Sequence, residues 1–580
     1  MPALTDADMN AQRCPLAAAP GPRYRKRVVA QAHTLAMPAA PRLLSPVLAC
    51  VLLLAGTTGA AQDVRLPRLG SRADTAFTQA EAAAYGAAML RQMRALDLVV
   101  DDPLANAYIN QLGYRLVAAS EAPKTPFTFF IPREDVINAF AAPGGYVGIN
   151  AGLITATQSE DELAAVMAHE ISHIEQHHLQ RAFDDARKVA PLYALAMLGA
   201  LAAAAGGSNA NAPMAIAALG QGAVLQRQIN FTRKDEAEAD RVGIQTLANA
   251  GFDPDGMAEF FGRMQMLLRA DSGGEDVPAL LQDHPVTTLR IAEAEARAHT
   301  LKQQLRMRAT APAETKVLPQ WERILLPPPL ATTADGALAA ARRSDAPGSP
   351  AAHAYYLLMR ERIRVLASSD LNALLRHYRG DLAHDPRFDT VANHYGYALV
   401  LIRSNQPQAA LAQLDPLLVA QPDSLPLRLA QAHARLLAGQ RAAALAGYAA
   451  LEHDWPRNPA VALEYANALV ASQRPADGHK AEALLRPLLA DSDQPELYRA
   501  YGRAAALAGL DVRAAEAFAD ATFLSGHAAA ALDQLQRLHQ RSDLDYAQRA
   551  RVDARIAELT PIVLEQRRQG SQRDTDSAQP

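Results

Sequence analysis

Prolines recur at a nearly constant spacing through the C-terminal part of the chain, and this repeat constrains the fold most. They are Pro350, Pro386, Pro422, Pro459 and Pro495. The intervals between them are 36, 36, 37 and 36 residues, and a helix-length segment, a turn and a second helix-length segment follow each one. One such unit cannot bury its apolar face alone, so successive units must stack. We therefore expect residues 350–566 to form an α-solenoid of about four to five tetratricopeptide repeats with a final helical cap. The polar tail, 567–580, is expected to be disordered.

A metal-binding motif precedes the repeats. His169, Glu170 and His173 match the pattern HExxH. Residues four apart lie on one face of a helix, so both imidazoles can bind one zinc ion while Glu170 stands beside a metal-bound water. Ser159 can serve as the N-cap of this helix, and Glu162 completes a capping box. The motif also recurs by chance as a helix with two surface histidines, so its meaning depends on further ligands.

A charged segment downstream offers a third ligand. Glu236, Glu238 and Asp240 lie on a helix that we predict for residues 230–243. Glu236 would bind the zinc ion. Asp240, one turn further on, would serve catalysis by accepting a hydrogen bond from a ligand imidazole and fixing its tautomer. The alternatives are that Glu238 is the ligand, or that these residues form a solvated acidic helix face.

The two motif histidines and Glu236 would leave a fourth zinc position open for water, as a catalytic site requires. We therefore expect one zinc ion per chain and a zinc metalloendopeptidase. Glu170 would take a proton from the water that attacks a peptide carbonyl. A metzincin would need glycine at position 176 and histidine at position 179, and the chain has Gln176 and Leu179. His178 falls one residue beyond helical spacing from the second histidine and is expected to be packed or hydrogen-bonded.

Three short extended segments precede the motif helix and predict a small sheet. They are residues 127–131, 136–140 and 146–150. The turn Pro143-Gly144-Gly145 joins the last two of them. A sheet edge beside a metal site can hold a peptide in extended form by strand addition.

Helices are expected on both sides of this sheet. A capping box at Thr78 opens a helix that should end near residue 96, and Asp102 before a proline opens another that should end near residue 119. The composition is rich in alanine and poor in aromatic residues, which also favours helices. We therefore predict a mainly α chain in which residues 62–307 form an α+β zinc metallopeptidase domain with a small sheet.

Residues 1–61 are expected to be a presequence. A basic residue, the apolar run 43–55 and the small residues after it are typical of a signal peptide that is cleaved near Ala60-Ala61. The only cysteines, Cys14 and Cys50, lie within this presequence. A mature chain would therefore have no cysteine-ligated metal and no cysteine nucleophile.

Two other segments have a distinctive composition. The apolar segment 189–224 predicts a helical hairpin, either a buried pair of core helices or a lid or patch that makes peripheral contact with a membrane or an unfolded client. Residues 308–349 are rich in proline and predict a linker with one short helix near 336–343. The net charge of −4 provides no basic surface for nucleic acid, so we expect no nucleic-acid partner.

Several separated motifs together resemble one peptidase family. They are the segment 138–146, the HExxH helix with His178-Leu179 after it, Glu236-x-x-x-Asp240, and His284-Pro285 followed by Arg290-Ile291. The set is similar to the HExxH gluzincin family that includes the CAAX prenyl proteases and the membrane heat-shock protease HtpX. The resemblance implies that an edge strand containing Asn138, Ala139 and Phe140 helps to bind substrate. It also implies that His284 faces the zinc ion, either as a fourth ligand that keeps the enzyme latent or as a group that steadies the oxyanion.

The presequence and the repeats are similar to those of the soluble, periplasmic branch of this family. That resemblance implies a periplasmic location and clients among unfolded or stalled outer-membrane β-barrel proteins. It implies that the repeats contact the β-barrel assembly machinery, and that the protein both promotes assembly in a chaperone-like way and degrades misassembled barrels. The alternative is a repeat-based adaptor or holdase with a largely latent protease. A membrane-embedded prenyl-type protease is disfavoured, because the catalytic half lacks multiple long apolar segments.

Overall fold

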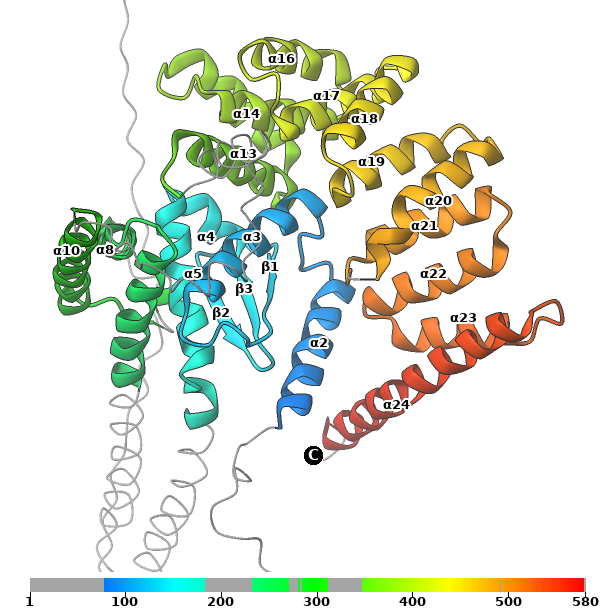
Figure 1. The fold of residues 1–580 in the computed structure, drawn as a ribbon, viewed down its shortest axis with the longest axis horizontal. Coiled ribbons are helices and arrows are strands. Elements are labelled where there is room, and N and C mark those ends of the chain that lie inside the picture. The colour runs from blue at the N-terminus through cyan, green and yellow to red at the C-terminus, as the bar shows by residue number, and fades with distance from the viewer. Residues whose placement is uncertain are drawn as a thin grey trace, which may run out of the picture. The chain divides into compact units, whose positions relative to one another are not determined.

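The computed structural model describes residues 78–182, 232–270, 280–281, 284–310, 347–490 and 492–577 (Figure 1). These residues are mainly helical and contain one small sheet, followed by a C-terminal series of helices, which confirms the predicted fold class. Three predictions lie outside the described residues: the signal peptide within 1–61, the hairpin at 189–224 and the linker helix at 336–343. In the described part of the chain, no helix is both long enough and apolar enough to cross a membrane.

Two helices begin where their capping residues predict. Before α2 (Gln79–Ala95), the Thr78 hydroxyl accepts a hydrogen bond from the N–H of Glu81 at 3.2 Å, and the Glu81 carboxylate accepts from the Thr78 N–H at 2.8 Å. Before α3 (Pro103–Ala119), the Asp102 carboxylate accepts from an N–H of the first turn at 2.9 Å. These caps satisfy N–H groups that have no partner within the helix, so both predicted starts are confirmed.

A three-stranded sheet follows these helices. Its strands are β1 (Thr128–Phe130), β2 (Ala139–Ala142) and β3 (Tyr146–Ile149). Their order is β1-β3-β2, with β3 parallel to β1 and antiparallel to β2, so β2 is an edge strand. β2 begins later in the chain than the predicted segment 136–140. The reason is the turn at Gly144 and Gly145, both at positive φ, which pairs Ala142 with Tyr146 and so sets the register.

The remaining helices of this half pack around the predicted motif. They are α4 (Ala151–Ala156), α5 (Glu160–Glu175), α8 (Asp255–Ala270) and α10 (Thr288–Thr310), together with a helical stretch at residues 232–249. α5 contacts α3, α8 and β2. The Ser159 hydroxyl accepts from the N–H of Glu162 at 3.1 Å, which confirms the predicted N-cap of α5. The predicted capping box is only half formed, because the Glu162 carboxylate binds the N–H of Gln158 at 2.8 Å and the guanidinium of Arg263 instead.

Helices α13 to α24 follow the linker region. Their bounds are α13 (Pro350–Ala367), α14 (Leu371–His384), α15 (Val391–Arg403), α16 (Pro407–Ala420), α17 (Leu425–Leu437), α18 (Arg441–Asp454), α19 (Pro459–Val470), α20 (Pro475–Leu489), α21 (Pro495–Leu507), α22 (Asp511–Leu524), α23 (Ala528–His539) and α24 (Tyr546–Ser577). Each recurring proline opens or precedes a pair of helices, and α23 and α24 come last.

Small residues are needed where helices meet. A Cβ atom at Gly502 of α21 would lie 2.7 Å from the Phe518 ring of α22.

The last helix is longer than the sequence predicts. We expect disorder from Arg567 onward, whereas α24 continues to Ser577. Glutamate, glutamine and arginine dominate residues 565–568, and all three favour helix, so the helix propagates beyond its packed part.

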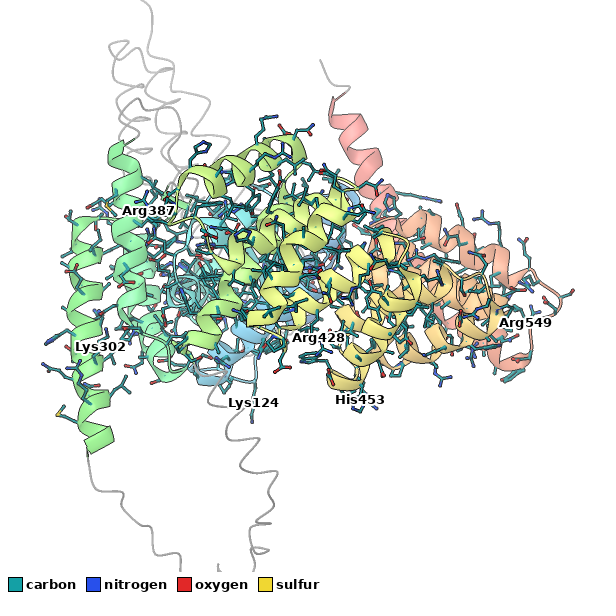
Figure 2. The ribbon with its side chains drawn as sticks, turned by 90° about the horizontal axis from the view of Figure 1, so that it is seen from above. Lys124, Lys302, Arg387, Arg428, His453 and Arg549 are labelled. Atoms are coloured by element: carbon teal, nitrogen blue, oxygen red, sulfur yellow. The ribbon has the colours of Figure 1, made fainter. Side chains whose placement is uncertain are left out.

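Buried and part-buried polar contacts join the repeat helices to the N-terminal half. Arg362 of α13 donates to both carboxylate oxygens of Asp102 at 2.7 Å each, and the Tyr356 hydroxyl donates to the carbonyl of Thr157 at 2.7 Å. Arg387, by contrast, projects from the surface (Figure 2), and its side chain is 91% exposed. The charge of Arg362 therefore pairs with a carboxylate of the N-terminal half, whereas the charge of Arg387 lies in solvent.

Candidate metal centre and substrate cleft

α5 places its three motif residues on one buried face. The Nε2 atoms of His169 and His173 lie 3.0 Å apart. This proximity follows from their spacing, since residues four apart share a helix face. Glu170 is 1% exposed and lines the same cavity as His173. The structure thus brings together the three residues of the motif.

The helical stretch 232–249 brings two carboxylates to this face. The Oε2 and Oε1 atoms of Glu236 lie 3.4 Å from the Nε2 of His169 and 3.5 Å from the Nε2 of His173. One turn further on, the Oδ1 of Asp240 lies 3.1 Å from the Nδ1 of His169. The two predicted carboxylates therefore meet opposite nitrogens of the same imidazole ring.

His284 supplies a fourth donor. Its Nδ1 lies 2.7 Å from the Oε1 of Glu236 and 3.4 Å from the Nε2 of His169. The backbone N–H of His284 donates to the carbonyl of Leu280 at 2.7 Å, and the N–H of Leu280 donates to the carbonyl of Ile137 at 3.2 Å. Ile137 lies just before β2, so the segment that carries His284 is hydrogen-bonded to the chain at the start of the edge strand.

The four donors have a spacing that fits a zinc ion. One donor atom from each of His169, His173, Glu236 and His284 lies within 4.8 Å of all the others. Zinc binds nitrogen and oxygen tetrahedrally at about 2.0–2.1 Å, which separates the donors by about 3.3–3.4 Å. The two Nε2 atoms lie 3.0 Å apart, and the two oxygens of Glu236 lie 3.4 Å from that of His169 (Oε2) and 3.5 Å from that of His173 (Oε1). Imidazole nitrogens with a carboxylate oxygen are also a donor set that zinc prefers.

The carboxylates of Glu236 and Asp240 favour positive charge at the group of donors. Burial raises the pKa of Glu236, but hydrogen bonds from His169 and His284 outweigh it and hold the pKa well below the usual range. Burial lowers the pKa of His169, but hydrogen bonds to Asp240 and Glu236 raise it to about 10. Burial and the charge of His169 hold the pKa of His173 well below its usual value, which keeps this ring neutral, as a metal ligand must be. A bound cation would replace the proton that the carboxylates attract to His169.

Arg290 belongs to this cluster, although the sequence assigned it no role beyond the end of a motif. Its Nε and Nη2 donate to the two oxygens of Asp240 at 2.7 and 2.8 Å, and its Nη1 lies 2.9 Å from the Oε2 of Glu236. Burial raises the pKa of Asp240, but hydrogen bonds from His169 and Arg290 outweigh it and lower the pKa. Arg290 therefore helps to keep Asp240 ionised and also pairs with Glu236.

Two residues near the site lie outside the group of four donors. The Oε2 of Glu238 lies 3.2 Å from the Nε2 of His178, on the far side of His173 from the donor group. His178 is buried, and its other ring nitrogen approaches the His173 ring. Glu238, the alternative ligand, is thus placed against a histidine that the sequence predicted to be packed or hydrogen-bonded.

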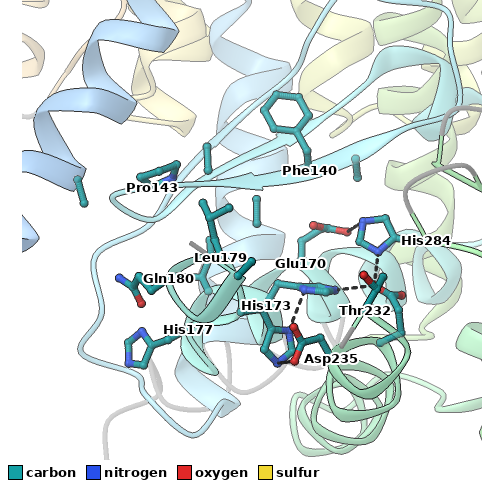
Figure 3. Close-up of a pocket in the computed structure, with 18 of the residues that line it drawn as sticks. Phe140, Pro143, Glu170, His173, His177, Leu179, Gln180, Thr232, Asp235 and His284 are labelled. Carbon is teal, nitrogen blue, oxygen red and sulfur yellow. Dashed lines mark hydrogen bonds and ion pairs between the residues drawn. The ribbon is translucent and has the colours of Figure 1, made fainter. Parts of the chain in front are cut away.

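β2 forms one wall of a cavity of about 330 Å³ that contains part of the metal centre. Figure 3 shows Phe140 on one side of this cleft and Glu170 and His284 on the other. Ala139 also lines the cavity, whereas the side chain of Asn138 turns back and accepts a hydrogen bond from the N–H of Ala139 at 2.9 Å. The predicted edge strand thus borders the donor group.

Comparison with known proteins identifies related peptidases. The model of peptidase family M48 matches residues 103–298. The chain is 32% identical over 499 residues to the β-barrel assembly-enhancing protease of Yersinia pestis, which covers 86% of this chain and 92% of the relative. It is 31% identical over 498 residues to the protein of the same name from Escherichia coli strain K12, with coverage of 86% and 91%. The mitochondrial metalloendopeptidase OMA1 of Schizosaccharomyces pombe is 30% identical over 188 residues, which cover 32% of this chain and 51% of that protein.

Proposed function

Because the chain belongs to the family of the β-barrel assembly-enhancing proteases, within peptidase family M48, we propose that it is a zinc-dependent endopeptidase of the periplasm that acts on outer-membrane β-barrel proteins. The observation that carries the chemical part of the proposal is the group of donors beside an edge strand. The names of the relatives support the choice of clients. The chain is a metalloendopeptidase, and the identity of its metal and its substrates are the proposed parts.

We assign one zinc ion per chain to His169, His173 and Glu236. Bound there, the ion would supply Lewis-acid chemistry that activates water and polarises a peptide carbonyl. Glu170 follows the first ligand directly and is buried in the cavity wall, so it is held at the reacting centre. In this position it takes a proton from the attacking water and delivers it to the leaving amine.

Asp240 acts through His169. Its carboxylate lies 3.1 Å from Nδ1, and this contact favours the tautomer whose proton sits on Nδ1, which leaves the Nε2 lone pair for the metal. The two bonds from Arg290 hold both oxygens of Asp240, so the carboxylate cannot rotate away. Asp240 and Arg290 together fix the tautomer and the orientation of one ligand.

We propose that His284 is a latch. Its Nδ1 belongs to the same group of donors, and a fourth protein ligand would occupy the position that a catalytic zinc site leaves open for water. Movement of His284 away from the other donors would free that position. The alternative is that His284 steadies the oxyanion, in which case its removal lowers activity instead of raising it.

We propose that substrate binds along β2. An unfolded segment of a barrel protein is an extended chain, and the outer edge of β2 offers backbone groups for strand addition. Ala139 and Phe140 line the cavity on that side, and Asn138 stands where the strand begins. A peptide paired with this strand would lie across the cleft from Glu170.

The repeats are proposed to hold clients or the β-barrel assembly machinery while the peptidase acts. Stacked helix pairs form extended surfaces that suit such contacts. Peripheral contact with the membrane would follow from this role. Export to the periplasm is tested by N-terminal sequencing of the mature protein, which should begin near Ala60-Ala61.

The competing proposal is an adaptor or holdase whose protease is largely latent. A Glu170→Gln variant separates the two, because it removes the general base and preserves the side-chain size. In cells that lack the protein, we expect this variant to fail to degrade stalled outer-membrane barrels while wild type degrades them. Equal rescue of barrel assembly by the variant and by wild type would favour the holdase.

A further inference from the structure

A chain of hydrogen bonds leads away from His173 on the side opposite to the donor group. The Nδ1 atoms of His173 and His178 lie 2.9 Å apart, and the Nε2 of His178 lies 3.2 Å from the Oε2 of Glu238. The Nη2 of Arg181 donates to Glu238 at 2.6 Å and to Asp235 at 2.9 Å, which holds the carboxylates in place. His178 is 4% exposed, so its own two contacts are shielded from water, whereas the side chains of Glu238 and Arg181 are 31% and 43% exposed.

A backbone turn explains how His178 reaches His173. In an unbroken helix, a residue five positions on points away from the face of the first. α5 ends at Glu175, and His177 adopts a φ of 55°, a backbone conformation that residues other than glycine rarely adopt. This left-handed residue redirects the chain, and the ring of His178 meets that of His173 edge-on, with centroids 4.7 Å apart.

The direction of every bond in this chain follows from the role of His173. If its Nε2 binds zinc, as the proposed function requires, the ring proton sits on Nδ1 and must be donated. The Nδ1 of His178 then accepts it, so the proton of His178 sits on Nε2. That N–H points to Glu238, whose carboxylate accepts it. Every hydrogen bond in the series then has one donor and one acceptor.

We propose that His178 is a positioning residue that fixes the tautomer and the ring orientation of His173 for metal binding, with Glu238 acting through it. Asp240 has the corresponding position beside His169, so each histidine ligand has its own partner outside the donor group. Loss of such a partner lowers metal affinity by about 10–100-fold.

Two substitutions of His178 separate positioning from packing. His178→Phe keeps the ring volume and removes both hydrogen bonds. His178→Gln can accept from His173 through its amide oxygen and donate to Glu238 through its amide nitrogen. The full chain, loaded with zinc, is titrated with a chelator at constant pH, and thermal unfolding of each variant is recorded in parallel.

We expect about 10–100-fold weaker zinc affinity for His178→Phe and a loss of only a few-fold for His178→Gln. His479→Phe, at an exposed position of α20, is the control for a histidine-to-phenylalanine exchange and should bind zinc as wild type does. Equal losses in both His178 variants would assign the effect to packing, and unchanged affinity in His178→Phe would refute any role. Wild type that binds no zinc would overturn the proposed function as well.

A double-mutant cycle tests the order of the chain. Glu238→Gln should weaken zinc binding in the wild-type background and should have no further effect in the His178→Phe background, because its contribution passes through His178. Additive losses would show that Glu238 acts by another route and would refute the serial arrangement.

Discussion

Replacing Arg362 with methionine tests how the repeat helices are fixed to the N-terminal half. The guanidinium binds both oxygens of Asp102 at 2.7 Å, and the two side chains are 11% and 13% exposed. The substitution removes the positive charge but keeps an apolar stem of similar length. The Asp102 carboxylate would then remain buried without a charged partner.

The expected loss can be estimated from this geometry. Removal of one partner from a buried ion pair costs about 3–5 kcal/mol, because the remaining charge is uncompensated. Asp102 keeps its hydrogen bond to the first turn of α3, which places the loss near the lower end, at about 3 kcal/mol. The cap itself is unchanged and adds nothing to the loss.

Urea denaturation of the full chain measures this loss as a change in the free energy of unfolding. Arg551→Met is the matched control, since Arg551 lies 3.1 Å from Glu516 with side chains that are 54% and 21% exposed. A pair as exposed as this contributes about 0–1 kcal/mol. Adding Asp102→Asn to Arg362→Met should recover stability, because asparagine also caps helices and is neutral. An Arg362→Met loss no larger than that of Arg551→Met would refute the reasoning.

The same pair predicts a pH dependence. Burial raises the pKa of Asp102, but the charge and hydrogen bonds of Arg362 outweigh it, so the folded pKa lies below its usual value. A lowered folded pKa stabilises the protein above the unfolded pKa of about 3.9. This contribution is lost as the pH falls through the folded value. The stability difference between wild type and Arg362→Met should therefore be full at pH 7 and shrink below about pH 4.

Three further outcomes are expected. Elemental analysis should find about one zinc ion per wild-type chain and almost none in Glu236→Gln, since the variant lacks a charged ligand; full metal content there would contradict the assignment. His284→Ala should raise basal cleavage of an unfolded peptide, and unchanged or lower cleavage would count against the latch. Gly502→Ala should destabilise the repeats by about 1–3 kcal/mol, because its Cβ would overlap the Phe518 ring. Gly447→Ala, whose Cβ would meet only an ordinary contact at 3.5 Å, should be neutral or stabilising.

Features set by neighbouring residues could be predicted from the sequence. The caps at Thr78, Asp102 and Ser159 depend on bonds across three residues, and all three form as expected. The period of the repeats could also be read from the sequence, because each pair of helices is formed by neighbouring residues. Glu162 shows the limit of this reasoning, because its carboxylate turns to Arg263 of α8, a partner that no local rule could identify.

Tertiary contacts decide the features that the sequence did not reveal. The helix predicted from Ser159 stops at Glu175, because His177 takes a left-handed conformation that histidine rarely adopts. The sequence predicted His178 to be packed or hydrogen-bonded, and it is, but helical spacing could not identify His173 as its partner. Arg290 reaches Asp240 across 50 positions of chain, and only packing of α10 against the rest of the domain brings them together. Each of the two residues contacts a proposed ligand: His178 contacts His173, and Arg290 contacts Glu236.

The proposed latch has a physical link to the proposed substrate strand. Leu280 donates to the carbonyl of Ile137 at 3.2 Å, and the carbonyl of Leu280 accepts from the N–H of His284. A peptide that adds to β2 pairs with backbone groups beginning next to Ile137, so its arrival competes with the bond from Leu280 to Ile137. If binding releases His284 in this way, substrate stimulates its own cleavage. That stimulation should be lost in His284→Ala, since no latch remains to release. A variant that is still stimulated as strongly as wild type would show that substrate binding at β2 does not act by releasing His284.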